Sequence, residues 1–509
     1  MTNQIAIASS SILAAEAGAE IARAGGNAVD AAIAAALVSM NTEPGVCSLG
    51  CGGYVTVRAP GEAALTYDGY VAVPGAGRAL DQQDRVAVPV HLEYGGGVDT
   101  VVGPDTIAVP GGIALLDAAS RAYGALPWQT LFEPAVQITR RGFPLPAASF
   151  HYLEYSGDPI FGRSADGRLA LHHPDGRLKA AGENIVVPHL ADTLERIARV
   201  GAADFYTGEL GRAMADFVQA QGGRLNEQDL GSYAVLERPS LVTRLGDWEI
   251  ATNPPPAVGG AVLSAMLQLM GQSRDLAWDA AGLARLIQVQ RAVLGYRRAR
   301  LDLSDDLAGD AERLLTAAGA GDLTTLLESG STCHTSAVDS NGLACSITLS
   351  AGYGAGEMPP GTGIWLNNCL GELELNKRGL EPGAPGSRLP SNMAPTTAIS
   401  RRGEVLAIGS PGADRITTAL IQTLVNYFVL GMNLQEAVDH PRLHVEFNGD
   451  DYRVACEEGL AIDANQPARH FPGRSMFFGG VGAAAWHPQA GFEVAADPRR
   501  TGGTWTSAD

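Results

Sequence analysis

Hydrophobic residues recur at helical spacing through much of the first two thirds of the chain, interrupted by short apolar runs typical of strands. Residues 4–8 form the first such run, and helical spacing follows from about 12 to 24 and from about 28 to 40. The three serines at 9–11 can cap the first helix, and the Gly-Gly-Asn that follows can end it. Further helices are predicted at 110–124, 128–141, 190–199 and 208–221.

The last third of the chain changes to alternating patterns that predict paired strands. Segments 332–338 and 343–349 flank Asp-Ser-Asn-Gly, a turn signal at hairpin spacing, and residues 395–410 predict a second hairpin. A helix is predicted directly after it, over 412–428. Asn433 and Glu436 have the spacing of a capping box. Helices, then a sheet, then helices again predict stacked helix and sheet layers in one domain.

Charge and cysteine usage exclude several classes of protein. With 509 residues, 46% hydrophobic and 18% charged, the chain has a globular composition, and its net charge of −19 argues against nucleic acid as a partner. The six cysteines form no metal-binding pattern with histidine, so we expect reduced, unpaired thiols, no metal and no cofactor. The N-terminus lacks the basic region of a signal peptide, and the apolar run at 28–40 is too short to cross a membrane. These features predict a cytoplasmic protein without membrane contact.

One predicted strand begins with small hydroxyl and thiol residues, in the stretch Ser-Gly-Ser-Thr-Cys at 329–333. A threonine that opens a strand is usually only a β-branched residue in its preferred place. If the chain is cleaved between Ser331 and Thr332, however, Thr332 gains a free amine with a pKa of about 7.7–8.0. The same residue then supplies a nucleophilic hydroxyl and its base. The spacing alone leaves both interpretations open.

Two further segments contain candidate binding groups. The Ser-Pro-Gly-Ala turn at 410–413 leads into a helix, whose first N–H groups can stabilise an oxyanion, although it can also be an ordinary strand-to-helix turn. Asn367, Asn368 and Glu372 can bind a polar ligand, but paired asparagines in a loop are more often turn residues with satisfied hydrogen bonds. His334, in the first hairpin, is expected to make a structural hydrogen bond.

Taken together, these segments resemble the γ-glutamyltranspeptidase family of N-terminal-nucleophile hydrolases over nearly the whole chain. Ten blocks carry the resemblance, in the order in which the family has them. They are GGNAVDAAIAAAL, EPGVCSLGCGGYVTV, AVPGGIALLDAASRAYGALPWQTLFEPAVQITRRGFPL, LNEQDLGSYAV, NPPPAVGGAVL, TCHTSAVDSNGLACSIT, GTGIWLNN, PSNMAPT, GSPGADRI and GMNLQEAVDHPRLH.

The resemblance implies an α+β fold of the four-layer αββα type and self-cleavage into two chains, 1–331 and 332–509, which stay associated as one structural domain. It implies that Thr332 attacks an amide carbonyl and that water or an amine acceptor then releases the acyl group. The family's oxyanion hole falls on Gly412 and Ala413, where most relatives have two glycines. The backbone N–H survives this Gly-to-Ala change, provided that the φ of Ala413 is negative.

The family's donor-binding positions differ in this chain. The arginine that holds the donor carboxylate corresponds to Tyr70, which removes a bidentate, charge-assisted contact. The family's Ser-Ser pair is Ser391 and Asn392 here. The groups that bind the donor's amino end correspond to Ser350, Cys369 and Glu372, of which Glu372 keeps the acidic character. Arg388 is a candidate replacement for the missing arginine.

Three functions are consistent with this pattern. The leading hypothesis is a self-processed acyl-transfer enzyme or hydrolase that acts on the amide of a small, non-standard acid and remains related to glutathione metabolism. The second is a family member of specialised metabolism that hydrolyses another amide or a carbon–carbon bond next to a carbonyl. The third is an uncleaved, inactive scaffold, which Cys333 leaves open because the residue after the nucleophile is normally a second threonine.

Overall fold

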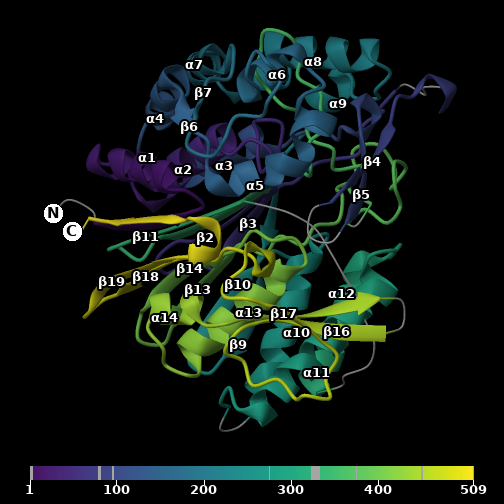
Figure 1. Ribbon diagram of the computed structural model, residues 1–509. Helices are drawn as coiled ribbons and strands as arrows, with labels where there is room; N and C mark the ends of the chain where they lie inside the picture. The colour runs from purple at the N-terminus through teal and green to yellow at the C-terminus, as the bar shows by residue number, and fades with distance from the viewer. Residues whose placement is uncertain are drawn as a thin grey trace.

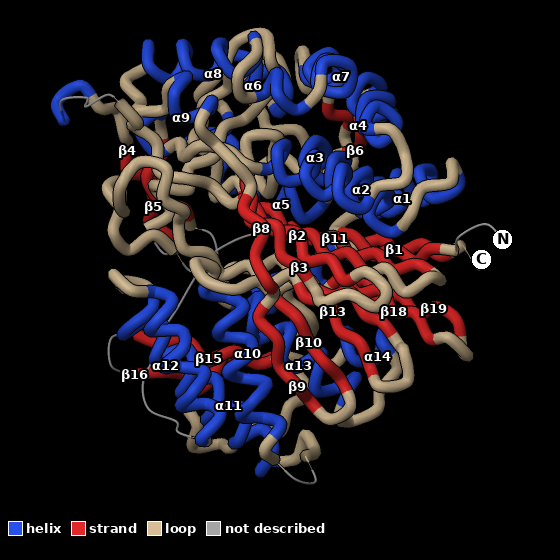
Figure 2. Tube along the Cα trace, turned by 180° about the vertical axis from the view of Figure 1, so that it is seen from behind, coloured by secondary structure: helices blue, strands red, loops and turns tan. Residues whose placement is uncertain are grey.

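Two sheets packed face to face form the centre of the molecule, and a layer of helices covers the outer face of each sheet (Figure 1). This arrangement comes from a computed structural model. The structure describes residues 4–77, 82–93, 97–273, 276–321, 333–373, 375–448 and 451–507. Figure 2 shows the four layers from behind, with the strands in the middle and helices on both sides. The expected αββα sandwich is therefore confirmed.

The first sheet has seven antiparallel strands. Their order across the sheet is β20 (Gly503–Thr506), β1 (Ile5–Ser9), β11 (Cys333–Asp339), β12 (Ala344–Ser350), β2 (Gly52–Arg58), β3 (Leu65–Gly69) and β8 (Leu236–Pro239). The predicted hairpin forms between β11 and β12, in register from Cys333 opposite Leu349 to Val338 opposite Ala344. Strands from before and after residue 332 are therefore interleaved within one sheet.

The second sheet has six antiparallel strands. Their order is β19 (Gly491–Ala496), β18 (Gly482–His487), β14 (Val405–Gly409), β13 (Thr396–Ser400), β10 (Trp248–Thr252) and β9 (Leu241–Leu245). Small side chains let the two sheets approach closely, and Ser346 Oγ donates a hydrogen bond to the Ile408 carbonyl across the gap at 3.0 Å. The apolar residues between the sheets are also mostly small: Ala6, Val338, Ala344, Val405, Ala407 and Ala484.

Helices of the N-terminal half cover the seven-stranded sheet, and later helices cover the six-stranded sheet (Figure 1). The first group is α1 (Ile12–Arg23), α2 (Ala28–Thr42), α3 (Gly112–Tyr123), α4 (Trp128–Arg141), α5 (Ala147–Ser156), α6 (Ala165–Leu171), α7 (Leu190–Val200), α8 (Glu209–Ala220) and α9 (Glu227–Gly231). The second is α10 (Val258–Gly271), α11 (Ala280–Tyr296), α12 (Leu307–Ala320), α13 (Arg415–Phe428) and α14 (Leu434–Asp439). Peripheral strands are β4 (Val88–Leu92), β5 (Val98–Val102), β6 (Phe143–Pro144), β7 (Asn184–Ile185), β15 (Leu443–Asn448), β16 (Asp451–Glu457) and β17 (Ala468–Phe471).

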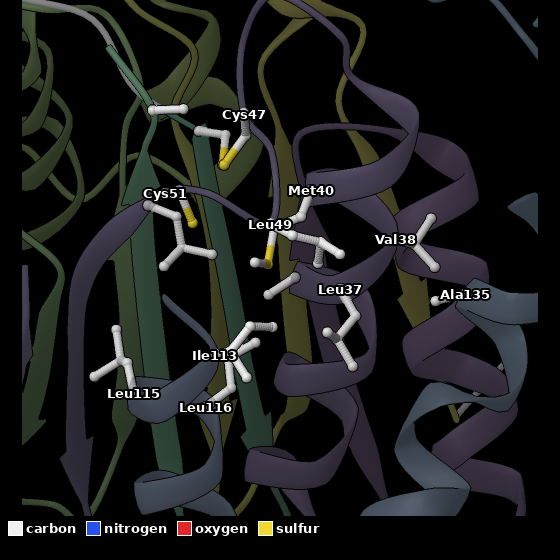
Figure 3. Close-up of a cluster of buried hydrophobic side chains, with 14 of the residues drawn as sticks. Leu37, Val38, Met40, Cys47, Leu49, Cys51, Ile113, Leu115, Leu116 and Ala135 are labelled. Atoms are coloured by element: carbon white, nitrogen blue, oxygen red, sulfur yellow. The ribbon is translucent and has the colours of Figure 1, made fainter. Parts of the chain in front are cut away.

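The larger hydrophobic core lies between the seven-stranded sheet and the first helix layer. Every residue of α2 is buried, which explains its Ala-rich sequence: the helix is covered on all sides. Figure 3 shows the part of this core where α2 and α3 meet the segment before β2, with Leu37, Met40, Cys47, Cys51 and Ile113 among the labelled side chains. All six cysteines are free and buried, as expected.

Local predictions from the sequence are confirmed at several helix starts. Ser11 caps α1 by accepting a hydrogen bond from the Ala14 N–H, and Asn433 and Glu436 form the predicted capping box of α14. Among the described residues, no helix is both long enough and apolar enough to span a bilayer.

Candidate active site

The proposed cleavage site, Ser331 and Thr332, lies outside the described residues, which resume at Cys333. The side chains around the start of β11 lie within the described residues. They fall into two sets: the turn at Gly412 with Asn392, and a group of polar side chains on Tyr70, Cys369 and Glu372. One apolar cluster that contains Tyr70, Cys369, Ala257 and Met393 joins the two sets.

His334, the second residue of β11, faces the six-stranded sheet and is fully buried. Ser336 Oγ donates to the Gly482 carbonyl at 3.2 Å and so accepts from His334 Nε2–H at 2.7 Å. The other ring nitrogen, Nδ1, then accepts from the Thr348 hydroxyl at 2.9 Å. Burial lowers the pKa of His334 to about 3, so its ring is neutral. The expectation of a structural role for His334 is confirmed.

The Gly412 turn lies beyond the end of β14, whose last residue packs on this histidine. A Cβ on Gly409 would lie 2.3 Å from His334 Cε1, so only glycine fits there. The chain then turns through Gly412 at φ +123° and Ala413 at φ +68° before α13 begins. The φ of Ala413 is therefore positive, and the alanine holds this conformation under strain. The left-handed conformation lets the chain pass from strand to helix in a few residues, with Gly412 packed against the Gly479 backbone.

The N–H groups of Gly412 and Ala413 donate to no acceptor within the described part of the chain. They lie one and two residues before Asp414, the N-cap of α13, where the helix dipole favours negative charge. Two adjacent free N–H groups at a helix start can hold a developing oxyanion. The turn therefore offers two adjacent backbone donors that a developing oxyanion could use.

Ser391 and Asn392 are held at the N-terminus of α10. The Ser391 carbonyl accepts hydrogen bonds from the N–H groups of Val258 at 2.7 Å and Gly259 at 3.0 Å. A Cβ on Gly259 would lie 2.1 Å from the Asn392 carbonyl oxygen, which explains the glycine in the first turn of this helix. Ser391 Oγ accepts from the Met393 N–H at 3.2 Å. Backbone contacts thus fix the two candidate donor-binding residues.

The Asn392 side chain contacts the residue that follows the turn. Its Nδ2 donates to Asp414 Oδ1 at 3.2 Å, and the same oxygen accepts from Arg297 Nη1 at 3.0 Å. Arg297 Nε donates to Asp302 Oδ1 at 3.0 Å. Burial works to lower the pKa of Arg297, but the two carboxylates together raise it, and the guanidinium is charged. Arg297, Asp302 and Asp414 therefore form a buried ion triad next to the turn.

The buried side chains of Tyr70, Cys369 and Glu372 lie together. The Tyr70 hydroxyl interacts with the Cys369 sulfur, and the Glu372 charge acts on both groups. Burial, reinforced by the nearby Glu372 charge, raises the pKa of both Tyr70 and Cys369 well above their ordinary values, so both groups are protonated. The Tyr70 ring also stacks on Tyr54, with ring centroids 5.7 Å apart. The wall formed here is aromatic and uncharged except at Glu372.

Ser350 ends β12 opposite Gly52 and lies next to these three side chains. Its Oγ accepts from the Gly352 N–H at 3.1 Å. Gly352, at φ +66°, packs on the Glu372 carboxyl, because a Cβ there would lie 2.9 Å from Glu372 Cδ. The structure therefore brings Ser350, Cys369, Glu372 and Tyr70 together, as the resemblance implies.

Three other candidates make hydrogen bonds to groups of the protein. Asn367 and Asn368 satisfy backbone groups: Asn367 Oδ1 accepts from the Ala108 N–H at 3.1 Å, and Asn368 Oδ1 accepts from the Tyr353 N–H at 2.7 Å. Arg388 Nε donates to Asp68 Oδ1 at 3.1 Å and its Nη2 to the Asp68 carbonyl at 3.1 Å. The guanidinium of Arg388 is therefore committed to Asp68, so it is not a free replacement for the missing arginine.

The family model for γ-glutamyltranspeptidase matches residues 14–507. The chain belongs to the γ-glutamyltranspeptidase family. It is 30% identical to the glutathione hydrolase proenzyme of Pseudomonas aeruginosa, over 86% of this chain and 82% of that protein. It is also 29% identical to the acylase ACY 1 proenzyme of Pseudomonas sp. strain V22, over 96% of this chain and 91% of that protein.

A solved structure shows the same fold. The cephalosporin acylase of Bacillus halodurans aligns with a TM-score of 0.83 at 22% identity and covers 99% of this chain and 96% of that chain. The γ-glutamyltranspeptidase-family chain thus has the N-terminal-nucleophile hydrolase fold and is an enzyme of the γ-glutamyltransferase and hydrolase type. Within the described ranges, no group of three or more His, Cys, Asp or Glu side chains can hold a metal ion.

Sequence reasoning missed Asp414, Arg297 and Tyr54. Arg297 and Asp414 are 117 positions apart, and no local spacing connects an arginine at the end of α11 with an aspartate after a turn. Tyr54 stands in an alternating strand where any aromatic residue fits. The only signal was that Asp414 directly follows the candidate oxyanion hole.

Proposed function

We propose that the chain is a precursor that cleaves itself between Ser331 and Thr332. The freed Thr332 amine then takes the proton from the Thr332 hydroxyl, whose oxygen attacks an amide carbonyl of the substrate. The oxyanion receives hydrogen bonds from Gly412 and Ala413, and the substrate's amine leaves with the proton that the Thr332 amine took up. The Thr332 amine then takes a proton from water or an acceptor amine, which releases the acyl group and frees the Thr332 hydroxyl. Relatives named as proenzymes support cleavage, and the free N–H groups of the turn support the acyl transfer.

The arrangement of strands supports lasting association of the segments 1–331 and 332–509. In the seven-stranded sheet, β11 and β12 of the second segment lie between β1 and β2 of the first. In the six-stranded sheet, β13 pairs with β10. Backbone hydrogen bonds therefore connect the two segments in both sheets, and a cut before Thr332 breaks none of these ladders.

The proposed donor is a small acyl amide without the α-carboxylate of a γ-glutamyl group. The observation that carries this proposal is the buried, uncharged contact between Tyr70 and Cys369 at the position where the family has its arginine. A carboxylate brought against these groups loses its hydration without gaining a cation, and unpaired buried charge is strongly unfavourable. Ser350, Glu372, Ser391 and Asn392 complete the proposed donor site.

Four p-nitroanilides that differ by one charge at a time test the donor. The γ-glutamyl compound has an amine and a carboxylate, 4-aminobutyryl only the amine, glutaryl only the carboxylate and butyryl neither. We expect kcat/KM for 4-aminobutyryl to exceed that for γ-glutamyl, and butyryl to exceed glutaryl. A charge-assisted contact is worth about 1.5–3 kcal/mol, so each ratio should be about ten- to a hundredfold. Preference for γ-glutamyl over 4-aminobutyryl overturns the proposed donor.

Cleavage is tested separately. On a denaturing gel, the wild type should give two fragments, with a new N-terminus at Thr332, and the Thr332→Ala variant should remain one band. A wild-type chain that stays intact after purification and prolonged incubation supports the scaffold hypothesis instead.

A further inference from the structure

Asp414 stands at the N-cap of α13, yet its carboxylate caps nothing. Aspartate at this position usually accepts a hydrogen bond from an N–H of the first helical turn, which stabilises the helix. Here the N-cap makes no side-chain hydrogen bond to the helix. The carboxylate instead faces inward, with 2% of its side chain exposed, and contacts Arg297 and Asn392. Asp414 therefore occupies the N-cap position of α13 without capping the helix.

The contacts of Asp414 connect three elements behind the candidate oxyanion hole. One of its oxygens, Oδ1, accepts from Arg297 Nη1 at 3.0 Å and from Asn392 Nδ2 at 3.2 Å. Arg297 lies just after α11, and Asn392 is held by the N-terminus of α10. The backbone of Asp414 directly follows Ala413. Any movement of the turn therefore disturbs the buried ion pair between Asp414 and Arg297.

The turn needs such support because its backbone is strained. Ala413 has φ +68°, a region that is unfavourable for a non-glycine residue. Strained conformations persist only where surrounding contacts fix them. A buried ion pair does not generally add net stability, but breaking one is strongly unfavourable because a charge is left unpaired. Such a pair is suited to holding one geometry.

We propose that Arg297 and Asp414, together with Asn392, hold the Gly412–Ala413 turn so that its two N–H groups face the reacting carbonyl. Arg297 and Asp414 are positioning residues, because they act through the turn and not on the substrate. The inference rests on the proposed role of this turn as the oxyanion hole. It also gives Asn392 a second role, since its amide braces the turn.

Arg297 itself provides a matched control, because it has two carboxylate partners. Asp302 and Asp414 each accept from the guanidinium at 3.0 Å, and their side chains are 3% and 2% exposed. Only Asp414 is attached to the turn. The experiment compares Asp414→Ala with Asp302→Ala by kcat and KM on the best donor of the panel, per mole of cleaved enzyme, with the melting temperature measured in parallel.

We expect Asp414→Ala to lower kcat at least tenfold with KM within about twofold of the wild type, because complete loss of one oxyanion donor costs 10²–10³-fold in kcat, or about 2.7–4 kcal/mol. Asp302→Ala should keep kcat within about twofold. Asp414→Asn, which retains an oxygen that can accept from Asn392, should recover most of the loss. Equal effects of the two alanine variants, or a kcat that does not change, overturn the inference. If an alanine variant fails to fold, the pair Asp414→Leu and Asp302→Leu, which keeps side-chain volume but accepts no hydrogen bond, makes the same comparison.

A second readout does not depend on turnover. In a crystal structure of Asp414→Ala, Ala413 should leave the left-handed region, whereas in Asp302→Ala it should remain near φ +68°. If the wild type hydrolyses no donor, the proposed function fails, and this comparison still decides the inference. An unmoved turn in Asp414→Ala overturns it.

Discussion

The left-handed conformation of Ala413 predicts that glycine at this position stabilises the protein. Ala413→Gly removes the steric cost of Cβ at φ +68°, which is roughly 1–2 kcal/mol. Glycine also gives the unfolded chain more freedom, which costs about 0.4–1 kcal/mol. The net expectation is a gain of about 0.5–1 kcal/mol in the free energy of unfolding.

Gly431 provides the reverse experiment at the same backbone angle. It also has φ +68°, and a Cβ there would meet nothing within 4 Å. Gly431→Ala therefore measures the conformational cost alone, and we expect it to destabilise the protein by the same 0.5–1 kcal/mol, about the amount that Ala413→Gly gains. The double variant should return close to the wild type, since no contact joins the two changes.

The measurement is calorimetry in the Thr332→Ala background, so that every sample is an uncleaved chain. An unfolding entropy of about 2.1 cal/mol/K per residue gives roughly 1 kcal/mol/K for 509 residues, so the shifts should be about +0.5 to +1 °C for Ala413→Gly and the opposite for Gly431→Ala. A lower melting temperature for Ala413→Gly refutes the reasoning, because it shows that contacts of the methyl group outweigh the backbone strain.

Three other variants test the site. Gly412→Ala should lower kcat about 10²–10³-fold, because its Cβ would lie 2.6 Å from the Gly479 Cα and the turn must shift; normal kcat contradicts the proposed oxyanion hole. Tyr70→Arg should raise kcat/KM for γ-glutamyl-p-nitroanilide at least tenfold relative to 4-aminobutyryl, and an unchanged ratio places the carboxylate elsewhere. His334, whose pKa of about 3 lies below its unfolded value of about 6.5, binds protons more weakly in the folded state, so stability is lost as pH falls below 6.5. Lowering the pH to 5 should cost the wild type about 2 kcal/mol more than His334→Gln, measured as melting temperature against pH; parallel curves argue against a buried neutral ring.

The sequence predicts those parts of the fold that depend on local pattern. The hairpin around Asp-Ser-Asn-Gly, the Ser11 cap and the capping box at Asn433 all follow from residues a few positions apart, and the structure has them. The conformation of Ala413 could not be predicted in this way, because the residues on either side of it make distant contacts: Gly412 packs on Gly479 and Asp414 pairs with Arg297.

The candidate site shows the same limit. Resemblance to the family identifies which positions surround the donor, but not what their side chains contact. The contact of Tyr70 with Cys369 and the ion pair of Asp414 with Arg297 join residues that are distant in sequence. Arg388 is a reasonable candidate until its bond to Asp68, 320 positions away, is seen. Each of these contacts is set by the tertiary structure, which no local sequence periodicity predicts.

The alternation of strands has a consequence for the lifetime of the enzyme. If the backbone is cut before Thr332, as proposed, β11 and β12 belong to a separate polypeptide that must insert between β1 and β2 to refold. A single chain closes this arrangement as an intramolecular process, whereas two pieces have to find each other while their apolar strand edges are exposed to aggregation. Such a cut would make refolding harder than the first folding, and the durability of the cleaved protein would then depend on how slowly it opens.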